Sequence, residues 1–251
     1  MTVLSGEYSS SRGISLDRSD LIRELVAANR ILSAEGVVDA FGHVSARSPE
    51  NPQRFLLSRA RAPECIEAED ILEFELDGTP IEAGDRKPYL ERFIHGAIYE
   101  ARPDVHSVVH NHSYAVIPFA VAGKKLRPLM HVCSVIGSDV PVWDSEDEFG
   151  DTDLLVSGIE MGQSLARTLG DKKAVLMRGH GATVVGNSVR DAVHTSVYLQ
   201  VNADLQFKAV MLANGDPVKV LTPGEMDIRA KKDVAFGIDR AWESWCRHAG
   251  L

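Results

Sequence analysis

The sequence predicts an α/β fold, built as a single layered domain in which helices flank a central sheet. Short apolar runs rich in β-branched residues alternate irregularly with longer segments of helical periodicity. The chain has 251 residues, 44% of them hydrophobic, which is enough for one large core or two small ones. No linker or internal repeat divides it. We therefore expect one domain over residues 16–251, preceded by a flexible tail over residues 1–15.

The first elements of this domain are marked by capping, glycine and β-branched signals. Ser19 is expected to cap a helix whose apolar positions lead to Gly36 as its stop. After this helix we expect a loop over Gly42–Arg47 and strands over Phe55–Leu57 and Ile71–Leu76. An Asp-Gly pair closes the second strand with a turn signal.

The middle of the chain gives the clearest pattern. Apolar residues recur at helical spacing from Leu90 to Ala101, which predicts an amphipathic helix that ends at Arg102-Pro103. The run Val105–Val109 predicts a buried strand. Residues Ser113–Ala122 are expected to be helical.

Further strands and helices follow, and the tail carries two tryptophans. We expect an edge strand over Val140–Trp143, a helix over Leu155–Leu169 stopped by Gly170, strands over Ala174–Met177 and Ala182–Val185, and a long helix capped by Ser188 with Asp191 that runs towards Asn214-Gly215. The segment from Met226 to Leu251, with Trp242 and Trp245, is expected either to cover a neighbouring subunit or to pack on its own domain.

Two histidines close the strand that follows the amphipathic helix. Alternate side chains of a strand share a face, so His110 and His112 project together, with Cα atoms roughly 6.5–7 Å apart. That spacing lets two imidazoles bind one divalent cation, whose bonds to nitrogen are about 2.0–2.1 Å long for zinc. His180 is the best third ligand, because it follows an apolar strand and has glycine on both sides, which lets bare backbone lie close to a metal. Packed or solvated histidines without metal are the competing interpretation.

A carboxylate precedes the histidine pair. Glu91 lies on the flank of the apolar stripe of the expected helix, at the edge of the core. A carboxylate placed there would stand near the metal without necessarily binding it, where a proton-transferring group is useful. A solvated helix glutamate is the alternative.

Four segments carry motifs that are specific in combination: Glu91–Tyr99, Ala101–Asp104, Val108–His112 and Arg178–Gly181. Together they resemble the class II aldolase/adducin family, over about residues 20–213. The resemblance implies that His110, His112 and His180 bind a divalent metal and that Glu91 is the general acid/base. It also implies a catalytic domain with a central, mainly antiparallel sheet, in homo-oligomers that are commonly tetramers with active sites at subunit boundaries.

The chain departs from the sugar-phosphate aldolases of that family. In those enzymes a Gly-Asn element and a Ser-Ser pair before the glutamate hold the substrate phosphate, whereas Gly42-His43 and Tyr89-Leu90 stand here. A leucine cannot hydrogen-bond an anion, and a tyrosine supplies one donor plus a large ring. These residues suit a flat aromatic substrate better, with arginines as bidentate partners of its carboxylates. The expected substrate-binding residues are His43, Ser45, Arg47, Ser58, Arg59, Tyr89, Arg178 and Tyr198.

Three segments are most similar to a branch of decarboxylases of the 3-hydroxy-2-methylpyridine-4,5-dicarboxylate and dihydroxyphthalate type. They are Gly42–Arg47, Phe55–Arg59 and Tyr89–Gly96. The resemblance implies a role in aromatic catabolism, a small anionic aromatic substrate, and one divalent ion per subunit: zinc or manganese, with iron or cobalt as alternatives. Decarboxylation of an ortho-hydroxy acid and aldol cleavage both need a Lewis acid for a developing oxyanion. We expect decarboxylation. Aldol cleavage of a sugar-like hydroxy-carbonyl compound is the first alternative, and a non-catalytic adducin-like interaction domain, which lacks the full metal set, is the second.

Composition excludes several other classes. The formal net charge of −9 argues against nucleic acid, whose binding depends on clustered lysine and arginine. No stretch resembles a signal peptide or a membrane span, so we expect a cytoplasmic protein with no membrane partner. Gly179-His180-Gly181 lacks the spacing of a dinucleotide site, so no nucleotide cofactor is expected. Cys65, Cys133 and Cys246 are unpatterned and are interpreted as reduced thiols.

Overall fold

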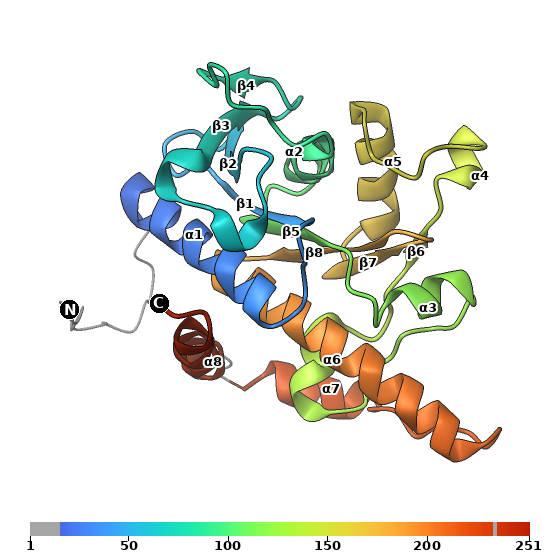
Figure 1. The fold of residues 1–251 in the computed structure, drawn as a ribbon. Helices are drawn as coiled ribbons and strands as arrows, with labels where there is room; N and C mark the ends of the chain where they lie inside the picture. The colour runs from blue at the N-terminus through green and yellow to red at the C-terminus, as the bar shows by residue number, and fades with distance from the viewer. Residues whose placement is uncertain (1–15, 233–234) are drawn as a thin grey trace.

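A single sheet runs through the molecule (Figure 1). The computed structural model describes residues 16–232 and 235–251, and within these ranges eight strands lie in the order β4-β3-β2-β1-β5-β8-β7-β6. Neighbouring strands run antiparallel, except β6 and β7, which are parallel. This mainly antiparallel sheet with flanking helices confirms the predicted fold class. The tail expected over residues 1–15 lies outside the described residues.

Most of the expected strands are confirmed, with ends that shift by a residue or two. The edge strand predicted before residue 143 is β6, which follows Pro141 and lies at the edge of the sheet. The strands are β1 (His43–Arg47), β2 (Arg54–Ser58), β3 (Ile71–Glu75), β4 (Pro80–Ile81), β5 (Ser107–Asn111), β6 (Val142–Trp143), β7 (Ala174–Met177) and β8 (Gly181–Gly186).

The expectation of a loop over Gly42–Arg47 is wrong, because β1 lies in the middle of the sheet. It pairs with β2 on one side and with β5 on the other. Three of its side chains, those of His43, Ser45 and Arg47, are polar, yet they are buried and hydrogen-bonded. From His43 to Arg47 polar and apolar residues alternate, which is the period-two signal of a strand, and both faces of this strand are buried.

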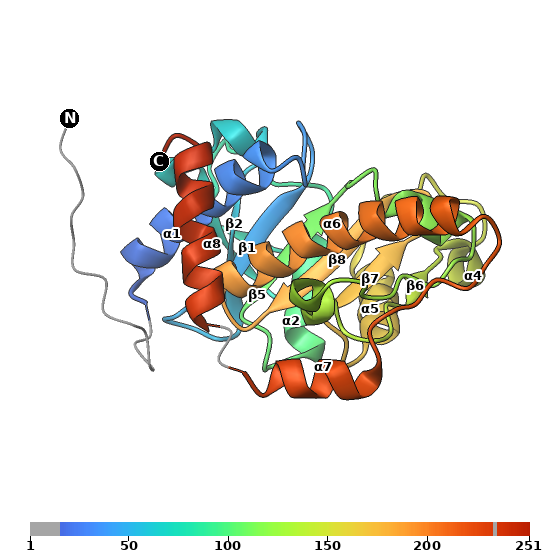
Figure 2. The same ribbon diagram turned by 90° about the horizontal axis from the view of Figure 1, so that it is seen from below.

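Helices cover both faces of the sheet (Figures 1 and 2). α2 (Arg92–Ala101) and α5 (Ile159–Leu169) pack against each other on one face. α1 (Arg18–Ala34), α6 (Val189–Ala213) and α8 (Ala235–His248) cover the other face, and each face has its own apolar core. The other helices are α3 (Ile117–Val121), α4 (Glu146–Phe149) and α7 (Pro223–Ala230), with 3-10 turns at Pro63–Cys65, Ala68–Asp70 and His131–Ile136.

The helix ends correct three details of the sequence analysis. Asp17, not Ser19, caps α1, because its carboxylate accepts a hydrogen bond from the Asp20 backbone N–H at 2.8 Å. Ser188 caps α6 as predicted, but the Asp191 carboxylate accepts from the Asn187 N–H, so the capping box is only half formed. α3 and α5 are shorter than expected, since each begins four residues later than predicted.

The C-terminal tryptophans pack on their own domain, which was the second of the two expectations for them. Trp242 and Trp245 are both 7% exposed and belong to the core under α6. The Trp245 ring lies 6.0 Å from the ring of His194 and 6.2 Å from that of Tyr198. Among the described helices, none offers an apolar stretch that would reach across a lipid bilayer.

Candidate metal centre

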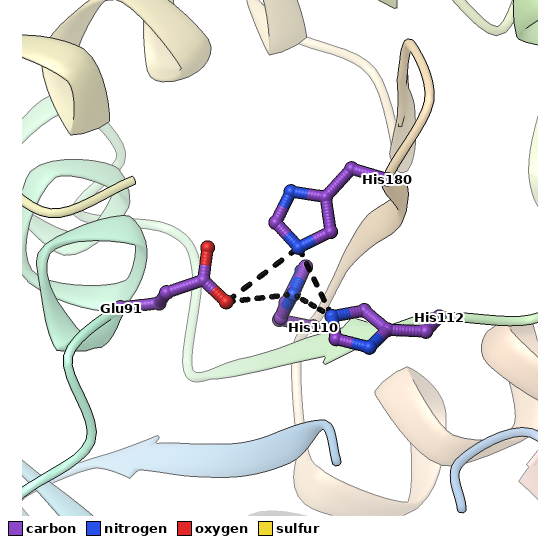
Figure 3. A group of neighbouring side chains, drawn as sticks. All are labelled: Glu91, His110, His112 and His180. Carbon is purple, nitrogen blue, oxygen red and sulfur yellow. Dashed lines mark hydrogen bonds and ion pairs between the residues drawn. The ribbon is translucent and has the colours of Figure 1, made fainter. Parts of the chain in front are cut away.

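The candidate site lies where three segments of the chain meet at one end of the central strands (Figure 3). His110 projects from β5, and His112 follows directly after that strand. His180 lies in the turn between β7 and β8, and Glu91 occupies the N-cap position of α2. The sheet therefore brings together residues that are up to about ninety positions apart, because β5 and β8 are neighbours.

Glycine lets the β7–β8 turn approach the end of β5. A Cβ atom added at Gly181 would lie 2.1 Å from the Asn111 carbonyl oxygen, which no side chain tolerates. Gly179 has a φ of +67°, in the left-handed region that glycine adopts without strain. The two glycines therefore allow the backbone contact that carries His180 to His112.

Four ligand atoms converge in this space (Figure 3). The Nε2 atom of His112 lies 3.0 Å from the Nε2 atoms of both His110 and His180. The Glu91 Oε2 atom lies 3.4 Å from His110 Nε2 and 3.6 Å from His180 Nε2. One ligand atom from each residue lies within 4.8 Å of every other. His110 is fully buried, and Glu91 and His180 are 8% and 9% exposed.

This donor set fits a divalent metal ion. Three neutral imidazoles whose Nε2 atoms face one another cannot all form hydrogen bonds among themselves, since each ring has only one N–H. Imidazole nitrogens and a carboxylate oxygen are common ligands of divalent transition metals. His110, His112 and His180 would hold such an ion, and Glu91 stands within reach of it.

Burial sets the charge state of these groups. Burial, followed by the neighbouring His110 and His180, lowers the pKa of His112 to about 4, which keeps the ring neutral and able to bind a metal. Burial also lowers the pKa of His110. For Glu91, burial alone would raise the pKa, but its interactions with His110 and His180 outweigh burial and lower the pKa.

Two of the expected substrate-binding residues, His43 and Tyr89, lie beside this centre, and a third, Arg59, directly follows β2. His43 is directly opposite His110 in the β1–β5 pairing, with ring centroids 5.1 Å apart. The Tyr89 ring lies 4.4 Å from that of His43, while its hydroxyl donates to the Arg61 carbonyl, so the ring rather than the hydroxyl faces His43. Arg59 is held by Asp70 through its Nε atom at 2.5 Å, and its terminal nitrogens make no hydrogen bond to any described residue.

Two other expected residues are sealed in the core. Ser45 is fully buried, and its hydroxyl bonds to His95 and Tyr99, so it cannot contact a substrate directly. Ser58 is also fully buried, beside the Tyr89 hydroxyl. Both therefore lie beneath the side chains that face the site.

The expectation for Arg47 is contradicted by its contacts. Its guanidinium is buried at the far end of β1 and donates to four backbone carbonyls, those of Pro52, Tyr99, Arg102 and Val105. Every nitrogen of the fork is thus occupied by the protein itself. Arg47 ties β1 to the end of α2 and offers nothing to a carboxylate.

Arg178 and Tyr198 contact other parts of the protein. The Arg178 guanidinium pairs with the carboxylates of Asp144 and Glu146, and it anchors the segment that follows β6. Tyr198 lies on the opposite face of the sheet, where its ring packs 4.7 Å from that of His194. Neither residue is kept as a substrate contact.

The sequence analysis assigned no role to two buried residues near the site. His95 and Tyr99 connect to His43 and Ser45 by hydrogen bonds, as discussed below. Glu91, His95 and Tyr99 follow one another at four-residue intervals, so they share one face of a helix. That periodicity is a signal from which all three could have been assigned to the same site.

Fold and site together define an α/β protein with a candidate metal centre built from three histidines and a glutamate. Its sequence matches the class II aldolase and adducin N-terminal domain family over residues 23–207, and the chain belongs to that family.

Individual relatives are similar along nearly the whole chain. The chain is 33% identical to decarboxylase tropJ of Talaromyces stipitatus, over 93% of this chain and 96% of that protein. It is 30% identical to the 3,4-dihydroxyphthalate decarboxylase of Arthrobacter keyseri, over 88% and 90% of the two chains. The structure of L-fuculose 1-phosphate aldolase from Glaciozyma antarctica matches with a TM-score of 0.76 at 25% identity, over 96% of both chains.

Proposed function

We propose that this protein is a divalent-metal-dependent lyase that decarboxylates an ortho-hydroxylated aromatic or pyridine dicarboxylic acid. The observation that carries the proposal is the convergence of three imidazole nitrogens and the Glu91 carboxylate within 4.8 Å of one another. The similarity to two proteins named as decarboxylases, one of them acting on 3,4-dihydroxyphthalate, favours a carboxy-lyase over an aldehyde-lyase.

The roles of the residues follow from their places. His110, His112 and His180 would hold the ion, for which zinc and manganese are the first candidates and iron and cobalt the next. A bound divalent ion supplies a Lewis acid that stabilises negative charge on a substrate oxygen. Glu91 Oε1 accepts the Val156 N–H at 3.0 Å, which leaves Oε2 directed at the centre.

Glu91 is proposed to move one proton. Its Oε2 atom takes the proton of the substrate's ortho-hydroxyl group, and the bond between the ring carbon and the carboxylate then breaks. Carbon dioxide leaves, and the electron pair stays on the ring carbon. Glu91 returns the proton to that carbon, and the hydroxyl oxygen regains a proton from solvent, so the overall reaction takes up one proton and replaces a carboxylate with hydrogen. General acid–base catalysis of this kind contributes about 10²- to 10⁴-fold.

His43, Tyr89 and Arg59 are proposed to bind the rest of the substrate. The Tyr89 and His43 rings present flat surfaces beside His110, which suit an aromatic ring. The unoccupied terminal nitrogens of Arg59 suit the carboxylate that is not lost. Ser58 is proposed to support Tyr89 from below.

Product identity tests this proposal. Metal-free protein is loaded separately with zinc, manganese, cobalt or ferrous iron and given 3,4-dihydroxyphthalate, 3-hydroxy-2-methylpyridine-4,5-dicarboxylate or L-fuculose 1-phosphate. We expect carbon dioxide and the monocarboxylate from an aromatic substrate with at least one metal. Aldehyde release from the sugar phosphate, with no reaction of the aromatic acids, would establish the aldolase alternative instead.

Metal binding separates both enzymes from an adducin-like interaction domain. Dialysis of the purified protein against each metal, followed by elemental analysis, should give about one ion per chain. A protein that neither contains nor takes up a divalent ion would lack the centre on which both reactions depend.

We also propose that the chain forms a homo-oligomer. Apolar side chains are exposed along the end of α6, which extends beyond the sheet in Figure 1: Phe207 (54%), Val210 (50%), Met211 (65%) and Leu212 (87%). A contiguous apolar surface of this kind is typical of an interface. Light scattering coupled to size-exclusion chromatography should give a mass close to four chains. A cytoplasmic location and a role in aromatic catabolism stay predictions.

A further inference from the structure

A hydrogen-bonded network of four buried polar side chains leads from the core to the candidate metal centre. His43 Nδ1 lies 2.7 Å from His95 Nε2, and His95 Nδ1 lies 2.6 Å from the Ser45 hydroxyl. The Ser45 hydroxyl in turn lies 2.7 Å from that of Tyr99. All four residues are at most 3% exposed. Burying so many polar groups is costly unless every one is paired, so an arrangement this complete calls for a function.

The hydrogen bonds of this network are expected to run in one direction, with each group donating to the next. A neutral imidazole has one N–H donor and one lone-pair acceptor, so the proton on each ring fixes the proton on the next. Ser45 could also accept from both neighbours, but its own buried O–H would then have no acceptor. Two orders remain, and they place the proton of His43 on opposite nitrogens. Both orders leave the rings neutral, so they differ in where the proton sits and not in charge.

Tyr99 decides between the two orders. The Ser45 hydroxyl is the only side-chain partner of its hydroxyl among the described residues. The phenolic proton therefore goes to Ser45, because in the opposite order a buried O–H would have no acceptor, at a cost of about 1–3 kcal/mol.

The remaining protons follow from this starting point. Ser45 donates to His95 Nδ1, and His95 Nε2–H donates to His43 Nδ1. The proton of His43 must then be on Nε2. That atom makes no hydrogen bond to any described residue and is not among the unpaired polar atoms sealed from solvent. The His43 ring itself lies between Tyr89 and His110, beside the centre.

We propose that Tyr99, Ser45 and His95 are positioning residues that hold His43 as a fixed N–H donor, with Nε2–H directed at an anionic oxygen of the substrate. The identity of that oxygen, on a carboxylate, rests on the proposed function. The tautomer itself does not, because the same proton order would serve a phosphate oxygen. A donor fixed in advance binds an anion without the cost of reorienting at each turnover.

The tautomer can be measured without any turnover. Nitrogen-15 NMR of the zinc-loaded protein, with histidines labelled and assigned by single substitutions, distinguishes a protonated from an unprotonated ring nitrogen. We expect protonation at Nε2 and a bare Nδ1 in both His43 and His95. A proton on His43 Nδ1 would overturn the proposal, whatever reaction the enzyme catalyses.

Substitutions then test the role of the hydrogen-bonded network. Tyr99→Phe removes the hydroxyl that sets the order, so His43 should become a mixture of tautomers. Binding of phthalate, used as an aromatic dicarboxylate that lacks the reacting hydroxyl, should weaken by about 10-fold, and kcat/KM on the active substrate by a similar factor. Thr195→Val, which removes a fully buried hydroxyl from α6, is the matched control and should leave the His43 spectrum unchanged.

His95 supplies a rescue experiment. In His95→Leu the donor to His43 is absent, and we expect phthalate affinity and kcat/KM to fall by about 10- to 100-fold while zinc content is kept. His95→Gln retains an amide N–H that can donate to His43 Nδ1, and it should restore much of the loss. Two results would show that the network only supports packing. One is an equal loss of phthalate affinity and kcat/KM in both His95 variants, and the other is a Tyr99→Phe protein whose His43 tautomer and phthalate affinity are unchanged.

Discussion

Buried histidines lie on both faces of the same sheet, in the candidate metal centre on one face and at His194 on the other, and they differ in what surrounds their nitrogens. His112 and His194 resemble each other in one respect, since burial lowers the pKa of each to about 4. The Nε2 atom of His112 lies 3.0 Å from two other imidazole nitrogens. His194 instead packs against the rings of Tyr198 and Trp245, and its Nδ1 has no hydrogen-bond partner among the described residues. A ligand is therefore recognised by converging lone pairs, and neither burial nor a lowered pKa is sufficient.

Removing one of the converging imidazoles should have the largest effect, which is on metal affinity. His180→Ala is expected to lower metal affinity by more than about 100-fold, because loss of groups that merely support a ligand already costs 10- to 100-fold. Activity should fall with the metal content. His194→Ala is the matched control, since it removes a buried histidine from the other face. Elemental analysis of both variants after dialysis should find metal only in the second, and the reverse result would exchange the roles of the two groups.

Substitution of Glu91 should reduce turnover more than it reduces metal binding. Glu91→Gln keeps the size of the side chain and the hydrogen bond with Val156, but an amide cannot carry the proton. We expect kcat to fall by about 10²- to 10⁴-fold with the metal retained. A variant that loses its metal would instead make Glu91 a ligand, as its distances of 3.4 and 3.6 Å to the imidazoles would allow.

The convergence of His110, His112 and His180 could be expected from the sequence because its signals are local. His110 and His112 stand two residues apart at the end of an apolar strand, and His180 lies between two glycines. Each pattern is complete within a few residues. The strand β1 was missed although polar and apolar residues alternate from His43 to Arg47, which is a local strand signal. Only the burial of its polar side chains depends on distant residues such as His95 of α2.

The arginines illustrate the limit of the same approach. Arg47 and Arg178 stand in suggestive motifs, but an arginine can form five hydrogen bonds with distant groups, and the sequence does not identify them. Four backbone carbonyls occupy Arg47, and two carboxylates occupy Arg178. Arg59 keeps free nitrogens because Asp70 engages only its Nε. Only the three-dimensional partners decide which arginine can bind a substrate.

The group around His194 should contribute to stability and not to metal binding. Trp245→Ala is expected to reduce the free energy of unfolding by about 3–5 kcal/mol, because it removes a large side chain that is 7% exposed under α6. Urea denaturation measures this loss, and the surviving folded protein should bind metal normally. Ile228→Ala on α7, where the side chain is 64% exposed, should change stability by less than about 0.5 kcal/mol.

The smallest effect expected is a change in how stability depends on pH. His194 takes up a proton at about 4 in the folded protein, against a reference pKa of 6.5, because burial disfavours its charged form. Between these values the unfolded chain binds more protons, so the contribution of His194 is complete above pH 6.5 and is lost as the pH falls towards 4. His194→Asn should therefore lose stability less steeply than the wild type across this window, by on the order of 2 kcal/mol in total.

Urea denaturation of both proteins at a series of pH values, in the presence of a chelator, measures this difference. His112 has the same lowered pKa and stays in both proteins, so its contribution cancels in the comparison and the difference belongs to His194 alone. Parallel curves would mean that His194 is already solvated in the folded state. In that case the packing of α8 on α6, which excludes water from the ring, would be looser than the contacts of Trp245 indicate.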